Sequence, residues 1–212
     1  MAELIGTFLL TFIGGAAIIN GQTGLIGVAL AHGLTVAFVI LAFGQISGAH
    51  INPAVTAGFL VTHKIQPKEG VVYIIAQLAG AVLAALVLKQ FVFGAMDALL
   101  GGQSVAPDVS TTAAIVIEIF LTFFLVTAIF GTAVDERGSF KSIAGFGIGM
   151  VVTAAILAGG PLTGASMNPA RSFGPALVSG QWGDQIVYWV GPLIGGAAAA
   201  ITYVSLFMKN SK

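Results

Sequence analysis

The chain has 212 residues, of which 57% are apolar and 8% charged, and its mean hydropathy of +1.01 excludes an ordinary water-soluble domain. Its formal net charge is zero and it lacks a basic stripe, which argues against nucleic acid as a partner. The absence of cysteine excludes disulfides, thiolate metal sites and cysteine nucleophiles. We therefore predict an integral membrane protein.

Six apolar runs are candidates to cross the hydrocarbon core of a bilayer as helices. In chain order they are residues 3–19, 25–43, 70–88, 113–134, 143–157 and 186–207. The first run lacks the flanks of a cleaved signal, so we expect it to be retained as a span. Residues 91–111, which carry Asp97 and Asp108, are predicted to be a loop between two halves of the chain.

Two further segments, residues 44–64 and 159–181, contain the same short motif. The sequence Ser-Gly-Ala-His-Ile-Asn-Pro-Ala-Val-Thr at residues 47–56 recurs as Thr-Gly-Ala-Ser-Met-Asn-Pro-Ala-Arg-Ser at residues 163–172. Asparagine is a frequent N-cap and proline is favoured at the first helical position, so each motif predicts a helix start. The apolar runs that follow are about 12 Å long as helices, against a hydrocarbon core of about 30 Å. We therefore predict two re-entrant half-helices.

The two halves of the chain match at an offset of about 115 residues. Glu3 pairs with Glu118, and Tyr73 pairs with Tyr188, in the same order as the two motifs. Each half holds three spans, an odd number, so the second half is predicted to enter the membrane upside down. The repeats, about residues 1–105 and 112–212, then form a single domain in which Asn52 and Asn168 meet near the midplane.

The basic residues that flank the spans predict the orientation, because cytoplasmic loops carry an excess of lysine and arginine. Six of them fall on one side, whereas Lys89 borders the other, and both termini are therefore expected in the cytoplasm. The six are Lys64, Lys68, Arg137, Lys141, Lys209 and Lys212.

Asn52 and Asn168 carry the first candidate chemistry. Plain capping is one interpretation; the other is that capping fixes each side chain and leaves its amide free to donate to whatever passes the midplane. The two helix N-termini also place partial positive charges of about +0.5 each at this point, which repel cations.

The paired motifs resemble the signatures of the aquaporin (major intrinsic protein) family, and the resemblance covers nearly the whole chain. It implies an all-α membrane protein with six transmembrane helices plus two re-entrant half-helices in an inverted repeat, and a homotetramer in the lipid bilayer. It also implies that the motif residues surround the pore: Asn52, Pro53, Ala54, Asn168, Pro169 and Ala170.

In this family, the arginine that follows the second motif belongs to a narrow extracellular filter. It corresponds to Arg171 here, and the other filter positions fall on His32, Ile156 and Ala165. This set is similar to that of the tonoplast intrinsic proteins of plants and departs from the Phe, His, Cys, Arg pattern of water-specific members. From the residues alone, a structural role for Arg171 and a satisfied buried imidazole for His32 stay open.

Glu3 and Glu118 are carboxylates inside predicted spans, which makes them candidates for function by default. The resemblance implies instead that they support the two re-entrant backbones, with His50 in the same scaffold. Backbone carbonyls would then be free to line the pore, at Gly48, Ala49, His50, Gly164, Ala165 and Ser166.

The sequence thus predicts a passive channel for water that also passes small neutral solutes such as ammonia or hydrogen peroxide and excludes protons and ions. No catalytic residue, metal ligand or cofactor site is expected. A glycerol facilitator is the alternative, although Ser172 and Trp189 resemble the water-channel pattern. A junction-forming membrane protein and a proton-coupled transporter are further alternatives. The expected location is the cell (plasma) membrane.

Overall fold

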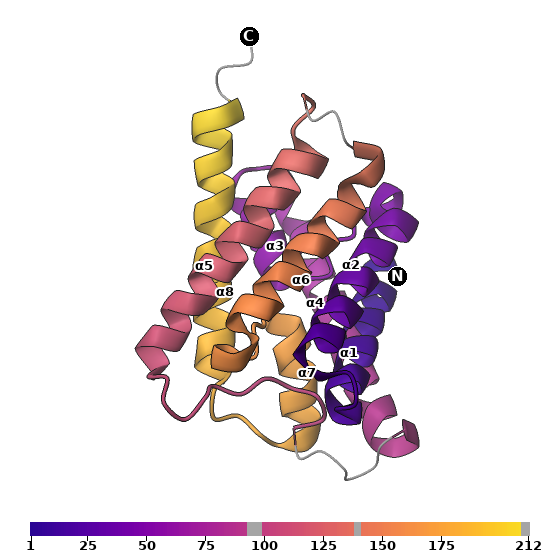
Figure 1. Ribbon diagram of the computed structural model, residues 1–212. Coiled ribbons are helices and arrows are strands. Elements are labelled where there is room, and N and C mark those ends of the chain that lie inside the picture. The colour runs from indigo at the N-terminus through magenta and orange to yellow at the C-terminus, as the bar shows by residue number, and fades with distance from the viewer. Residues whose placement is uncertain (93–98, 138–140, 209–212) are drawn as a thin grey trace.

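The computed structural model describes residues 1–92, 99–137 and 141–208, and the regular elements in these ranges are all helices (Figure 1). Among them, six helices are long and apolar enough to cross a membrane. They are α1 (Ala2–Asn20), α2 (Gly24–Ser47), α4 (Pro67–Val87), α5 (Thr111–Ile129), α6 (Ala144–Thr163) and α8 (Gln185–Tyr203). The predicted class, an all-α membrane protein with six spans, is confirmed. Asp97, Lys209 and Lys212 lie outside the described residues.

Two short helices, α3 (Pro53–Val61) and α7 (Pro169–Ser179), follow the two motifs directly. Their lengths match the predicted half-helices. Three of the long helices continue into a π-helical turn at Leu88–Val92, Phe130–Val134 and Val204–Met208.

Helices α2 and α6 run further than the sequence predicted, to Ser47 and Thr163 in place of residues 43 and 157. Each ends only where a glycine adopts the left-handed conformation, with φ of 81° at Gly48 and 73° at Gly164. Such a C-terminal glycine accepts this conformation without a Cβ penalty. Because both glycines belong to the motifs, the helix ends deliver the motifs directly into the interior.

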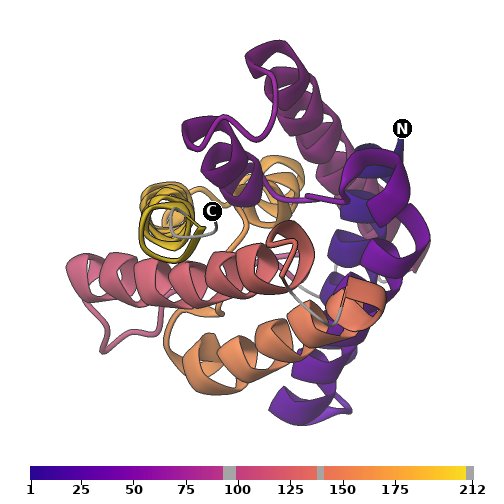
Figure 2. The same cartoon turned by 90° about the horizontal axis from the view of Figure 1, so that it is seen from above.

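The half-helices α3 and α7 lie between α4 and α8 in the view from above (Figure 2). The main pairings are α1 with α4, α5 with α8, and α2 with α6, while α3 packs on α8 and α7 on α4. Corresponding glycines allow the first two: a Cβ on Gly80 would lie 2.2 Å from the Leu4 carbonyl oxygen. A Cβ on Gly195 would lie 2.3 Å from the Ile119 carbonyl oxygen. Both pairs therefore need glycine, because the helices approach at backbone distance.

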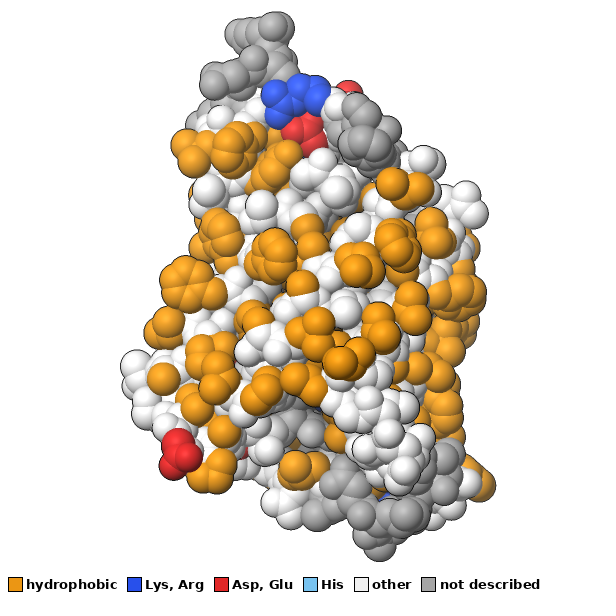
Figure 3. Space-filling view, in the orientation of Figure 1, with side chains coloured by type: hydrophobic (Ala, Val, Ile, Leu, Met, Phe, Trp, Pro, Cys, Tyr) orange, Lys and Arg blue, Asp and Glu red, His pale blue; other side chains and the backbone are white. Residues whose placement is uncertain are grey.

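The outer surface is apolar between the two ends of the molecule (Figure 3). Phe38, Phe120 and Ile75 are 58%, 69% and 61% exposed, values that a water-soluble protein rarely shows for so many large apolar residues. On the face drawn in Figure 3, the charged side chains lie near the ends. This distribution suits a molecule whose flank contacts lipid hydrocarbon.

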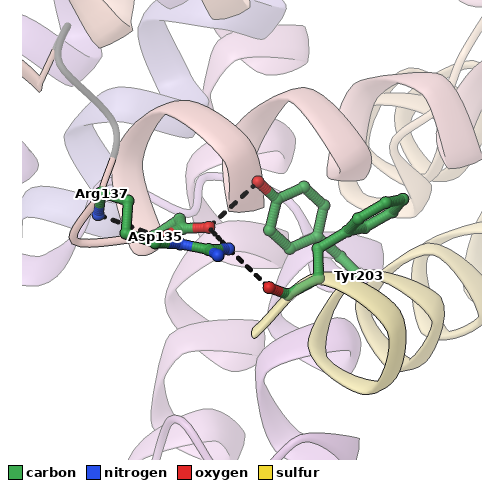
Figure 4. A network of polar contacts seen from close by, with 4 residues as sticks. Asp135, Arg137 and Tyr203 are labelled. Carbon is green, nitrogen blue, oxygen red and sulfur yellow. Dashed lines mark hydrogen bonds and ion pairs between the residues drawn. The ribbon is translucent and has the colours of Figure 1, made fainter. Parts of the chain in front are cut away.

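A polar cluster joins the end of the α5 span to the end of the α8 span (Figure 4). Asp135 accepts a hydrogen bond from Arg137 Nη2 at 2.6 Å and from the Tyr203 hydroxyl at 3.2 Å. Arg137 Nη2 also donates to the carbonyl oxygen of Phe207. The hydrogen bonds from Arg137 hold the pKa of the Asp135 carboxyl well below its ordinary value.

Stability should therefore depend on pH through Asp135. A depressed native pKa stabilises the fold above the unfolded pKa of about 4, and this contribution is lost as the pH falls through the native value. We expect Asp135→Asn to lower the unfolding temperature of the detergent-solubilised protein near neutral pH and to reduce the loss of stability on acidification. Thermal unfolding across a pH series measures both. Identical pH profiles for parent and variant would contradict the assignment.

Candidate functional site

The two half-helices begin at the two asparagines, as their sequence predicts. The Asn52 side-chain oxygen accepts from the Ala54 backbone N–H at 2.8 Å. The Asn168 side-chain oxygen accepts from the N–H groups of Ala170 and Arg171 at 3.0 and 3.3 Å. Pro53 and Pro169 follow as first helical residues. These caps fix the direction of both side chains.

The amide nitrogens of the two asparagines connect the halves of the molecule. Asn52 Nδ2 donates to the Met167 carbonyl oxygen at 2.7 Å, and Asn168 Nδ2 donates to the Ile51 carbonyl oxygen at 2.8 Å. The sequence interpretation left the whole amide free. In the structure each NH2 group spends one of its two hydrogens on the opposite segment, so one hydrogen each remains.

Both acceptors are non-glycine residues in the left-handed region, with φ of 45° at Ile51 and 53° at Met167. Ala49 and Ala165 also have positive φ, of 48° and 47°. This conformation is rare for a β-branched residue such as isoleucine and costs on the order of 1–3 kcal/mol. It persists only where surrounding contacts hold the backbone in place.

Glu3 supplies those contacts in the first half, where it is 2% exposed. One carboxylate oxygen accepts from the Ser47 hydroxyl at 2.6 Å and the His50 N–H at 2.9 Å. The other accepts from the Ile51 N–H at 2.6 Å and from Gln77 Nε2 at 2.7 Å. Backbone N–H groups at membrane depth need such partners because no bulk water reaches them.

Glu118 repeats the arrangement in the second half and has no solvent exposure. Its Oε1 accepts from the Thr163 hydroxyl at 2.7 Å and from the Ser166 N–H at 2.9 Å. Its Oε2 accepts from the Met167 N–H at 2.8 Å. Each carboxylate thus holds the two residues that precede its asparagine.

Sequence reasoning missed two glutamines that complete this framework. Gln77 Nε2 also donates to the Thr56 hydroxyl at 3.1 Å, and Gln103 Oε1 accepts from the Ser172 hydroxyl at 2.8 Å. A glutamine inside an apolar span is itself a signal, because polar groups at membrane depth are rare without a partner. Gln77 could have been identified on that ground; Gln103, in a loop, could not.

The four residues expected to form a filter come together around one narrow cavity of about 50 Å³. His32, Ile156, Ala165 and Arg171 all line it, together with Asn52 and Asn168. It shares part of its wall with a wider cavity of about 610 Å³, which opens beside Phe59, Ala133 and Ser142. These two spaces are called the narrow cavity and the wide cavity below.

The residues expected to contribute carbonyls distribute unevenly over these walls. Ala49, His50, Ala165 and Ser166 line the narrow cavity, whereas Gly48 lines only the wide one. Gly164 lines neither, because it packs against Gln103, whose Cβ lies 2.8 Å from the position of a Cβ on Gly164.

Arg171 and His32 form a hydrogen-bonded pair in the wall. Arg171 Nε and Nη2 lie 3.3 and 3.0 Å from His32 Nε2, and His32 Nδ1 lies 2.8 Å from the Val28 carbonyl oxygen. Guanidinium nitrogens only donate, so Nε2 accepts and Nδ1 carries the hydrogen that Val28 receives. Arg171 Nη1 is buried and has no hydrogen-bond partner among the described residues, and Arg171 lines the narrow cavity.

The position of Ala165 permits a chemical test. Its side chain lines the narrow cavity and the chain contains no cysteine, so the parent should resist mercurials. We expect Ala165→Cys to conduct water and to be inhibited by a mercurial, as measured by light scattering of proteoliposomes. Val116→Cys on the apolar surface is the control and should bind the reagent without inhibition. A folded, conducting Ala165→Cys protein that stays insensitive would remove Ala165 from the pore wall.

Six membrane-capable helices, a narrow cavity and two half-helix N-termini that face each other across it define a passive membrane channel. Residues 1–203 match the model of the family described as Major intrinsic protein. The chain therefore belongs to the major intrinsic protein family, and it is a channel for water and small neutral solutes, not an enzyme.

Individual relatives agree with this assignment. The chain is 45% identical to Aquaporin TIP4-4 of Zea mays, with 99% of this chain and 86% of that protein covered. It is 44% identical to Aquaporin TIP2-1 of Arabidopsis thaliana, with 100% and 88% covered. The solved structure of the aquaglyceroporin from Plasmodium falciparum superposes with a TM-score of 0.89 at 28% identity, covering 98% of this chain and 95% of that one.

Proposed function

We propose that the channel passes water together with ammonia or hydrogen peroxide and excludes protons and other ions at a filter formed by His32, Ile156, Ala165 and Arg171. The observation that supports this proposal is that all four residues line the one narrow cavity. The side chains of Ile156 and Ala165 are both apolar. Arg171 contributes a charged group whose Nη1 is a buried hydrogen-bond donor without a partner among the described residues.

Neutral solutes and ions should separate in such a passage for electrostatic reasons. A small neutral molecule exchanges its water contacts for the Arg171 donor and the remaining asparagine hydrogens without great loss. A cation sheds a hydration shell worth far more, and then faces the guanidinium and the N-terminal ends of α3 and α7, all of which repel it. We propose that the motif residues and the carbonyls near them form the rest of the path.

The glycerol alternative is disfavoured by the relatives, which include several TIP aquaporins at 42–45% identity. The similarity to an aquaglyceroporin structure reflects the shared fold. Reconstituted protein should be compared by stopped-flow light scattering under sucrose, glycerol and ammonium gradients. We expect fast water and ammonia flux with slow glycerol flux; glycerol flux comparable to water would establish the alternative, and the absence of water flux would overturn the proposal.

The two halves, about residues 1–105 and 112–212, are proposed to be inverted repeats of one channel domain. The matched contacts of Glu3 and Glu118, and the reciprocal bonds of Asn52 and Asn168, support this arrangement. Both termini are proposed to be cytoplasmic, on the distribution of basic residues. Tags at either end should then be protected or exposed together in oriented vesicles.

The assembly and the membrane of residence complete the proposal. A homotetramer is proposed from the family resemblance, and native mass spectrometry in detergent tests it. The relatives are named as TIP aquaporins, and the proposed filter resembles that of tonoplast intrinsic proteins. Both observations weigh against the expected location in the cell membrane. Fractionation of the source cells decides between the cell membrane and an internal one.

A further inference from the structure

The imidazole of His32 lies directly on the backbone of α1 at Gly14. A Cβ built on Gly14 would lie 2.2 Å from His32 Nε2, 2.6 Å from Cδ2 and 2.7 Å from Cε1. All three contacts are shorter than any that real Cβ atoms make. The outer edge of the ring therefore occupies the space that any other residue at position 14 would fill.

The backbone conformation does not require glycine at this position. Gly14 is an interior residue of α1 and is absent from the positive-φ glycines of the described chain. In a helix interior, glycine is less favourable than alanine. The space for the ring is thus the physical reason for a glycine here.

The ring has few other directions in which to move. Its Nδ1 is held by the Val28 carbonyl at 2.8 Å, and its Nε2 by Arg171 at 3.0 Å. Its remaining free surface lines the narrow cavity. A methyl group at position 14 meets Nε2 first, so it would push the ring into the cavity and separate it from Arg171.

We propose that Gly14 is a specificity-determining residue of the channel: it forms a recess in α1 that keeps the His32 ring out of the conducting path and its Nε2 on Arg171. This inference rests on the proposed filter. Gly14 sets the free width and the direction of the guanidinium without touching the permeating molecule. Filling the recess therefore narrows the passage and acts more strongly on hydrogen peroxide than on water, because hydrogen peroxide is the larger molecule.

The test compares hydrogen peroxide and water permeability in proteoliposomes for the parent and for Gly14→Ala. We expect the peroxide-to-water ratio to fall about tenfold, the lower end of the effect of one methylene in a tight pocket. Gly15→Ala is the matched control, because its new Cβ would meet the tip of the Leu88 side chain, 2.8 Å away, and not the His32 ring. It should leave the ratio unchanged. An equal fall in both variants would overturn the proposal.

A second background separates the ring from general packing. In His32→Ala the ring is absent, so adding Gly14→Ala should change the ratio no further; a further fall would overturn the role of Gly14. If Gly14→Ala alone does not assemble, the proposal requires that the double variant with His32→Ala assembles. A double variant that also fails to assemble would overturn the proposal. If His32→Ala leaves the parent ratio unchanged, the proposed filter itself is wrong. If His32→Ala shifts the ratio and Gly14→Ala does not, only the present inference fails.

Discussion

Replacing Glu118 by leucine is expected to abolish assembly of the channel, whereas Glu118→Gln retains part of it. The leucine leaves the N–H groups of Ser166 and Met167 buried without an acceptor, and also the Thr163 hydroxyl. Each unsatisfied buried group costs about 1–3 kcal/mol. The sum approaches the total stability of an ordinary domain, about 5–15 kcal/mol. The left-handed backbone at Met167 loses its support at the same time.

Glutamine is the informative intermediate because it keeps one acceptor oxygen and turns the other into a donor. The carboxylate accepts on both oxygens, so the amide NH2 of a glutamine would face a group that also donates. We expect a monodisperse but less thermostable protein for Glu118→Gln and aggregation for Glu118→Leu, measured by size-exclusion chromatography and thermal unfolding. Glu69→Gln is the control, since Glu69 is exposed and, among the residues that the structure describes, its side chain accepts a hydrogen bond from the Tyr73 hydroxyl alone. A fully stable Glu118→Leu protein would refute the supporting role.

Ile156→His is expected to lower the ammonia-to-water permeability ratio by about tenfold. This is the lower end of the discrimination that a small change in the shape of a pocket produces. Ile156 is 4% exposed and lines the narrow cavity. An imidazole there reaches further across the passage than the aliphatic chain does. It also adds a polar group that holds water, and so changes both width and hydrogen bonding.

The control for this prediction is Ile156→Leu, which conserves volume and apolar character and should keep the parent ratio. Both variants are compared with the parent at equal protein density, with water flux from an osmotic gradient and ammonia flux from the internal pH change. A histidine variant that conducts water with an unchanged ratio would show that Ile156 does not face the permeating molecule. Selectivity would then have to be assigned to other wall residues.

The sequence by itself determined the elements whose causes are local. Runs of apolar residues long enough for a bilayer become helices, and Asn-Pro starts a helix because the cap and the fixed φ act within a few residues. For this reason the six spans and both half-helices could be predicted, although the ends of α2 and α6 could not. Those ends depend on left-handed glycines at positions 48 and 164, beyond residues that are still compatible with a helix.

Only the tertiary structure decided how the interior is connected, because the partners are distant in the chain. The crossed bonds of Asn52 and Asn168 join residues 115 and 117 positions apart, and Gln77 reaches Glu3 across 74 positions. No local pattern specifies the positive φ of Ile51, which long-range hydrogen bonds hold against steric preference. The contact of His32 with Gly14 is of the same kind: the sequence shows a histidine and a glycine, and helix packing alone makes one the recess for the other.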